Sequence, residues 1–204
     1  LWTWCEGILL KTKKEKIPKM RTFIAINLDP EIKKALSLLI EELDKGHKNI
    51  KWVRHEGMHL TFKFLGEIGI EKVPEIENVL KMISGNHESF SMKFKGTGSF
   101  PSGMKNPRVL WVGIEEEETL TALQAQLEGE LEKLGFPRER RKFHAHLTLG
   151  RVKSSFNIKE TLSLLEKYRD RDFGEMNAKK ISFIQSTLKP TGAEYSILSE
   201  FELK

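Results

Sequence analysis

Two short segments of the sequence carry the residues best suited to chemistry, and both follow one pattern. His59 and Thr61 flank a leucine in the first segment, and His146 and Thr148 flank a leucine in the second. Successive side chains of a strand point to opposite faces, so the His and the Thr of each segment share a face. The apolar residues between them then point into a core. Two such strands facing each other would bring two imidazoles and two hydroxyls together.

Two imidazoles and two hydroxyls are suited to acid–base chemistry on an oxyanion such as phosphate. Imidazole titrates near pH ~6.5, so one ring of a pair can be neutral while the other is charged. The neutral ring can take a proton from water, and the charged ring can give a proton to the departing oxygen. Each role is worth on the order of 10²–10⁴ in rate. A lone His on a strand is more often structural, but the matched pair favours a functional interpretation.

Two basic residues beside the motifs are candidate phosphate ligands. Lys63 shares a face with His59 if the alternation continues along the strand. Strict alternation places Arg151 on the opposite face from His146, so Arg151 reaches the site only if the strand ends or bulges at Gly150. A planar guanidinium binds phosphate well, which makes this break in the second strand a specific expectation.

A metal site is the main competing interpretation of the histidines. His144 and His146 are two residues apart, and such a pair can chelate zinc or copper, with His59 as a third nitrogen. The acidic residues, however, cluster on predicted helices, and a metal site leaves both threonines without a role. His144 would otherwise lie at the start of its strand and position His146 or a ligand.

The hydrophobic periodicity predicts strands and helices in alternation. We expect helices over residues 31–45, 73–82, 119–134 and 158–168, a loop over 96–107, and strands over 21–28, 50–53, 58–65, 90–95, 108–114, 143–149 and 195–203, with a further strand centred on 181–184. Glycines are expected to end both motif strands. Each half runs strand, helix, motif strand, helix, strand, which favours an α+β protein with two similar lobes.

Composition and charge set limits on the class of protein. The chain has 204 residues with 31% charged residues, which indicates a soluble protein, and its net charge of +5 is compatible with a polyanionic partner. The single cysteine, Cys5, excludes an internal disulfide and a thiolate metal cage, and it fits a reducing cytoplasm. No stretch approaches the ~20 apolar residues of a membrane span.

The start of the chain differs from the remainder. A strand-like run follows Met20, so we expect a folded domain over residues 20–204 and an N-terminal extension over residues 1–19, disordered or loosely docked. Lysines follow the short apolar start, whereas a secretory signal carries its positive charge first. The alternative is an ordinary N-terminal element packed by Trp2 and Trp4.

The motifs and their surroundings resemble the two-histidine phosphoesterases, and within them the RNA 2′,3′-cyclic phosphodiesterases, long called 2′-5′ RNA ligases. The resemblance is carried by His59-Leu-Thr61 with Phe-Leu-Gly after it, and by His146-Leu-Thr148 with Gly-Arg after it. It covers nearly the whole chain apart from residues 1–19. One departure is Ala145, where many relatives have proline before the second His.

The resemblance implies a fold, a reaction and a set of residue roles. The fold is α+β, with two pseudo-symmetric lobes of antiparallel sheet, helices packed outside, and the motif strands lining a central cleft. The reaction opens a terminal 2′,3′-cyclic phosphate on RNA to a 2′-phosphate without metal or cofactor. The implied roles are proton donor for His59, proton acceptor for His146, phosphate binding for Thr61, Thr148 and Arg151, with Lys63 adding charge, and substrate contact for Phe64 and His144.

Two alternatives remain open beside the phosphodiesterase. One is 2′-5′ joining of tRNA halves by the same residues, and the other is a non-catalytic protein that binds RNA ends. The expected partner in each case is RNA, tRNA included, with no membrane. We expect the protein to act in the cytoplasm as a monomer.

Overall fold

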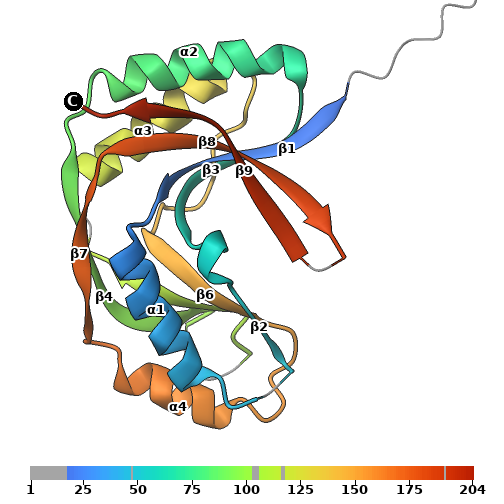
Figure 1. Ribbon diagram of the computed structural model, residues 1–204, viewed down its shortest axis with the longest axis vertical. Helices are drawn as coiled ribbons and strands as arrows, with labels where there is room; N and C mark the ends of the chain where they lie inside the picture. The colour runs from blue at the N-terminus through green and yellow to red at the C-terminus, as the bar shows by residue number, and fades with distance from the viewer. Residues whose placement is uncertain (1–17, 47, 103–105, 116–117, 191) are drawn as a thin grey trace, which may run out of the picture.

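Two antiparallel sheets, each covered on its outer side by two helices, make up the fold (Figure 1). The computed structural model describes residues 18–46, 48–102, 106–115, 118–190 and 192–204. The expected α+β fold with two lobes is confirmed. The expected extension lies outside the described residues up to position 17, and the first strand begins at Lys19.

The first sheet has four strands and the second has five. In spatial order the first sheet contains β3 (His59–Gly69), β1 (Lys19–Asn27), β8 (Lys180–Lys189) and β9 (Gly192–Glu202), and the second contains β2 (Ile50–Trp52), β6 (His146–Val152), β5 (Val109–Ile114), β4 (Phe90–Phe100) and β7 (Asp172–Ala178). The helices are α1 (Pro30–Leu43), α2 (Val73–Ser84), α3 (Glu118–Lys133) and α4 (Lys159–Lys167), with single turns η1 (His55–Gly57) and η2 (Ile70–Lys72). Each motif strand therefore belongs to a different sheet.

The lobes exchange elements, so they do not coincide with the two halves of the sequence. Helix α1 follows a strand of the first sheet but packs against β7 and α4 of the second lobe. Helix α3 follows a strand of the second sheet but packs against β3 and α2 of the first lobe. Figure 1 shows α2 and α3 over one sheet and α1 and α4 over the other. These crossings tie each lobe to the other.

The core of the molecule is shared between the lobes. Helix α1 buries Ile32, Leu36, Leu39 and Leu43, which recur at the spacing of one helical face. Residues of both motif strands belong to the same buried cluster as this helix. Because one core supports β3 and β6 together, the two strands are held in a fixed relation.

Two strand predictions were incomplete. Strand β4 continues to Phe100, so the first five residues of the expected loop over 96–107 belong to the sheet. Strand β7 was not predicted, and a single strand centred on 181–184 was expected where the structure has β7 and β8. The segment Asp172–Ala178 contains Asp, Gly and Asn, which are depleted in strands, and it lies at a sheet edge. None of the described helices is both long enough and apolar enough to cross a membrane.

Candidate active site

The two motif strands face one cleft of about 500 Å³ between the sheets. His59 and Thr61 of β3 line it together with His146 and Thr148 of β6. The side chains that alternate with them, such as Leu60 and Leu147, are buried on the core side. The cleft expected from the doubled motif is therefore present.

The prediction for Lys63 was wrong, because β3 does not alternate regularly beyond Thr61. Its pairing with β1 shifts register twice, between Thr61 and Lys63 and again between Phe64 and Gly66. The first shift turns Lys63 to the core side, where its Nζ donates to Glu128 Oε2 at 2.5 Å. Gly66 was expected to end the strand. It lies instead within the strand, at the second register shift, with a φ of 73°. Lys63 supplies no charge to the cleft.

Arg151 reaches the cleft through a register shift in β6. The pairing of β6 with β5 shifts between Thr148 and Gly150, so strict alternation is lost there. Arg151 is exposed and lines the cleft beside His146. A Cβ on Gly150 would lie 2.8 Å from Cε3 of Trp52, so the shift requires a residue without a side chain. The strand continues past this glycine to Val152.

The ring of His146 is held in one tautomer. Its Nδ1 donates a hydrogen bond to the backbone carbonyl of His144 at 2.7 Å, and a carbonyl can only accept. The Nε2 atom of the neutral ring therefore keeps a free lone pair. Phe100 packs edge-on against the ring, with centroids 5.1 Å apart. His144 thus acts on His146 through its backbone, while its own exposed side chain lies beside Phe100 and does not line the cleft.

The ring of His59 lies in an apolar setting. Its centroid is 4.7 Å from that of Phe23 and 5.1 Å from that of Tyr195, which meets it edge-on. Burial, aided by the positive charge of Lys33, lowers the pKa of His59 from 6.5 to about 4. The ring is therefore neutral at neutral pH.

An apolar rim surrounds the mouth of the cleft. Phe64 of β3 is 69% exposed, Leu188 of β8 is 66% exposed and Tyr195 of β9 is 41% exposed. All three line the cleft, and their exposed faces can pack against a base or a sugar. Sequence reasoning identified Phe64 but missed Leu188, Tyr195 and Phe23. These residues come from strands that only sheet pairing brings beside the motifs, and no local pattern marks them.

The metal alternative receives no support from side-chain geometry. In the part of the chain that the structure describes, no group of three or more His, Cys, Asp or Glu side chains is placed to hold an ion. His59, His144 and His146 therefore do not form the three-nitrogen set considered above.

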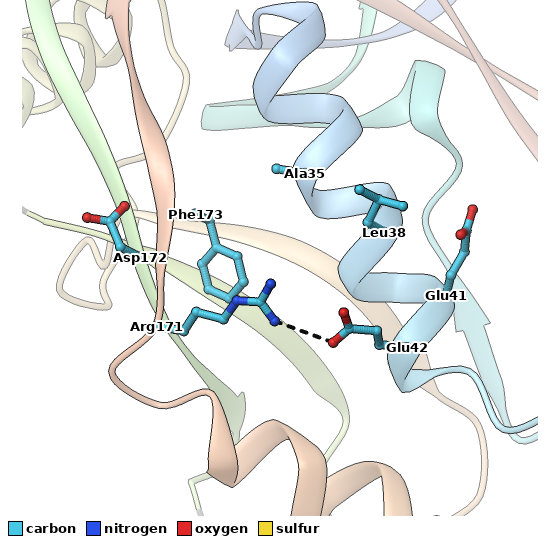
Figure 2. Close-up of a pocket in the computed structure, with 7 residues that line it drawn as sticks. All are labelled: Ala35, Leu38, Glu41, Glu42, Arg171, Asp172 and Phe173. Carbon is cyan, nitrogen blue, oxygen red and sulfur yellow. Dashed lines mark hydrogen bonds and ion pairs between the residues drawn. The ribbon is translucent and has the colours of Figure 1, made fainter.

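A second cavity of about 520 Å³ lies away from the motifs, between α1 and the start of β7 (Figure 2). Arg171 crosses it to Glu42 at 3.4 Å and lies over the ring of Phe173, 5.5 Å from its centroid. The guanidinium is thus engaged by its neighbours, and neither motif contributes a residue. This cavity is not a candidate for the chemistry of the motifs.

Two antiparallel sheets each contribute a His-x-Thr strand to one cleft, an arrangement suited to acid–base chemistry on a phosphate ester. The sequence matches the LigT like Phosphoesterase family over residues 26–111 and again over residues 112–195. The chain belongs to this family and is a hydrolase. Each match contains one copy of the motif, in agreement with the internal repeat seen in the sequence.

Similar proteins match this chain over almost their whole length. The RNA 2′,3′-cyclic phosphodiesterase of Archaeoglobus fulgidus is 39% identical over 183 residues, which cover 90% of this chain and all of that protein. The protein of the same name from Thermotoga maritima is 40% identical, covering 91% of this chain and 96% of that protein. The crystal structure of TT0787 of Thermus thermophilus superposes with a TM-score of 0.77 at 28% identity, over 90% of this chain and 98% of that one.

Proposed function

We propose that the protein hydrolyses a terminal 2′,3′-cyclic phosphate on RNA to a 2′-phosphate. The observation that carries the proposal is the convergence of two His-x-Thr pairs on one cleft, with Nε2 of His146 left free as an acceptor. The names of relatives 39–40% identical over at least 90% of the chain support the same activity.

The reaction divides between the two imidazoles. Nε2 of His146 takes a proton from water, the water oxygen forms a bond to phosphorus, and the bond from phosphorus to O3′ breaks. His59, charged in the complex, gives its proton to O3′, which leaves as a hydroxyl. The negative charge of the bound phosphate favours the protonated form of His59 and opposes the burial that lowers its pKa.

The remaining polar groups of the cleft hold the phosphate. Thr61 and Thr148 donate their hydroxyls to the non-bridging oxygens, and Arg151 offers two parallel N–H donors. Ring strain in the cyclic phosphate favours its opening, so these groups and the two imidazoles suffice without a metal. We place the reaction in the cytoplasm and in a monomer, with RNA as partner.

Hydrolysis of a cyclic-phosphate RNA in excess EDTA tests the proposal. We expect wild type to open the phosphate, and His59→Ala and His146→Ala each to lose about 10²–10⁴ in kcat. His87→Ala is the matched control, since that ring contacts Gln126 and does not line the cleft. Wild type that binds the RNA without opening the phosphate would make it an RNA-end-binding protein, and activity abolished by EDTA would refute the metal-independent mechanism.

The same residues can run a second reaction. If the 5′-hydroxyl of another RNA replaces water as the proton source, its oxygen forms the bond to phosphorus and a 2′-5′ joint results. Incubating wild type with paired tRNA halves and looking for a joined product separates this ligation from hydrolysis.

A further inference from the structure

Another hollow, distinct from the cavity at Arg171, opens directly from the catalytic cleft. This second hollow of the cleft has a volume of about 580 Å³. It lies between the segment from β2 to η1 and the start of β9. The two hollows share part of their walls, namely Val53, Gly57, Arg151, Ala193 and Tyr195. A polymer whose end occupies the cleft can therefore continue into the second hollow without leaving the surface.

Two cations lie directly opposite each other in this hollow. Lys51 of β2 and Arg151 of β6 are paired residues, and both are exposed. Side chains at paired positions of neighbouring strands are close, so like charges there repel and destabilise the pairing. An anion bound between Lys51 and Arg151 would remove that repulsion. Arg54 also lines this hollow.

The acidic residues of the hollow do not cancel this charge. Glu194 lies 2.7 Å from Lys189, a cation of the same hairpin that neutralises it. Glu56 is the other acid of the wall. Because Lys189 neutralises Glu194, Lys51 and Arg151 together outweigh Glu56 and leave an excess of positive charge beside the cleft.

The shared wall also offers an aromatic surface. Tyr195 lines both hollows, is 41% exposed and meets the ring of His59 edge-on at 5.1 Å. Trp52 lines the second hollow beside it. Cationic side chains interleaved with aromatic rings are the arrangement that binds single-stranded nucleic acid.

We infer that the second hollow binds the nucleotide preceding the cyclic-phosphate end, with its phosphodiester held by Lys51. The preferred substrate is then an RNA strand and not a cyclic mononucleotide. This inference rests on the proposed phosphodiesterase activity and deepens it.

The test compares a cyclic mononucleotide with a trinucleotide ending in the same cyclic nucleotide. For wild type we expect kcat/KM to be at least about tenfold higher for the trinucleotide, which corresponds to about one well-stacked base or ion contact. Lys51→Gln should reduce this ratio severalfold. It should also lower the slope of log KM against the logarithm of the salt concentration by about 0.7 for the trinucleotide. Lys81→Gln, an exposed lysine of α2, is the charge-matched control and should keep the wild-type ratio.

The outcomes separate the inference from the function on which it rests. Equal kcat/KM values for the two substrates in wild type would overturn the subsite while leaving the phosphodiesterase intact. The subsite would also be overturned if Lys51→Gln kept the wild-type ratio of the two kcat/KM values, or if Lys81→Gln reduced that ratio as much as Lys51→Gln does. Failure to hydrolyse either substrate would instead refute the proposed function.

Discussion

The two imidazoles of the cleft have different surroundings although their motifs match. His59 is packed between Phe23 and Tyr195, and its pKa is lowered to about 4, mainly by burial. His146 keeps one nitrogen on the carbonyl of His144 and presents the other to the cleft. The repeat thus supplies two similar side chains, and their neighbours make them unequal.

The low pKa of His59 leads to a prediction about pH dependence. The reaction needs one proton on the pair of histidines. Near pH 4 His59 takes up a second proton, so kcat/KM of the free enzyme should fall on the acid side there. Lys33→Gln removes a nearby positive charge, so the pKa of His59 should rise and the acid limb should move to higher pH. Lys34→Gln, on the exposed side of α1, is the control. Profiles of kcat/KM from pH 3.5 to 9 measure the shift.

Two results would contradict this account of His59. One is an acid limb above pH 6 in wild type, which would mean that burial does not lower the pKa in solution. The other is an equal displacement of the limb by Lys33→Gln and Lys34→Gln, which would remove the specific contribution of Lys33.

At the residue scale the sequence predicted the grouping of the motif residues in one cleft. His59 with Thr61, and His146 with Thr148, are only two positions apart, and the strand alternation holds over so short a distance. The prediction failed for Lys63, four residues from its His, because a register shift lies between them. Side-chain direction along a strand is predictable only as far as the next bulge.

The elements on the core side of the cleft are joined by a buried ionic network. Lys63 of β3 donates to Glu128 of α3 and to the carbonyl of Pro137 at 2.8 Å. Glu128 also accepts from the backbone N–H of Glu139 at 3.1 Å. The network connects the first motif strand to the segment that leads to the second, and buried charges require such complete pairing.

The shift at Gly150 gives a prediction for β6. Gly150→Ala would place a Cβ 2.8 Å from Cε3 of Trp52 and 2.9 Å from Cγ2 of Ile50, so the strand must move. We expect a loss of about 1–3 kcal/mol in the free energy of unfolding, typical of overpacking, together with a raised KM because Arg151 is displaced. Urea denaturation and steady-state kinetics measure the two effects.

A glycine in an ordinary setting provides the control for Gly150→Ala. A Cβ on Gly85 would meet the Lys81 carbonyl oxygen at 3.4 Å, which is normal contact. Gly85→Ala should therefore leave KM at its wild-type value. If Gly150→Ala also kept both stability and KM, the register shift would not depend on the missing side chain.

At the element scale, strong periodicity decided what could be predicted. The four helices were expected within a few residues of their observed bounds, because each carries apolar residues at helical spacing. The edge strand β7 was not predicted, and neither was the exchange of α1 and α3 between the lobes. An edge strand rich in poor strand formers has little pattern, and the choice of packing partner depends on the tertiary structure.

The whole molecule combines a repeat with a single core. The family matches one half of the chain after the other, yet buried residues from both lobes form one cluster. The β8–β9 hairpin forms one side of the first sheet (Figure 1) and borders both hollows. The cleft is therefore complete only when the motif strands of both lobes and this hairpin have folded together.

The burial of His59 in the folded protein links the protonation of its ring to the free energy of unfolding. Above pH 6.5 its ring is neutral in both the folded and the unfolded chain, so it contributes no pH dependence. Between pH 6.5 and about 4 the unfolded chain takes up a proton that the folded protein refuses, so the free energy of unfolding falls as the pH falls. The total loss is on the order of 3 kcal/mol. His59→Gln has no such proton, so urea denaturation at pH 7 and pH 4.5 should show a smaller loss of stability in the variant than in wild type. Equal losses would mean that folded His59 binds the proton as readily as it does in the unfolded chain. The pKa of His59 would then not be lowered, and no anionic substrate would be needed to charge it.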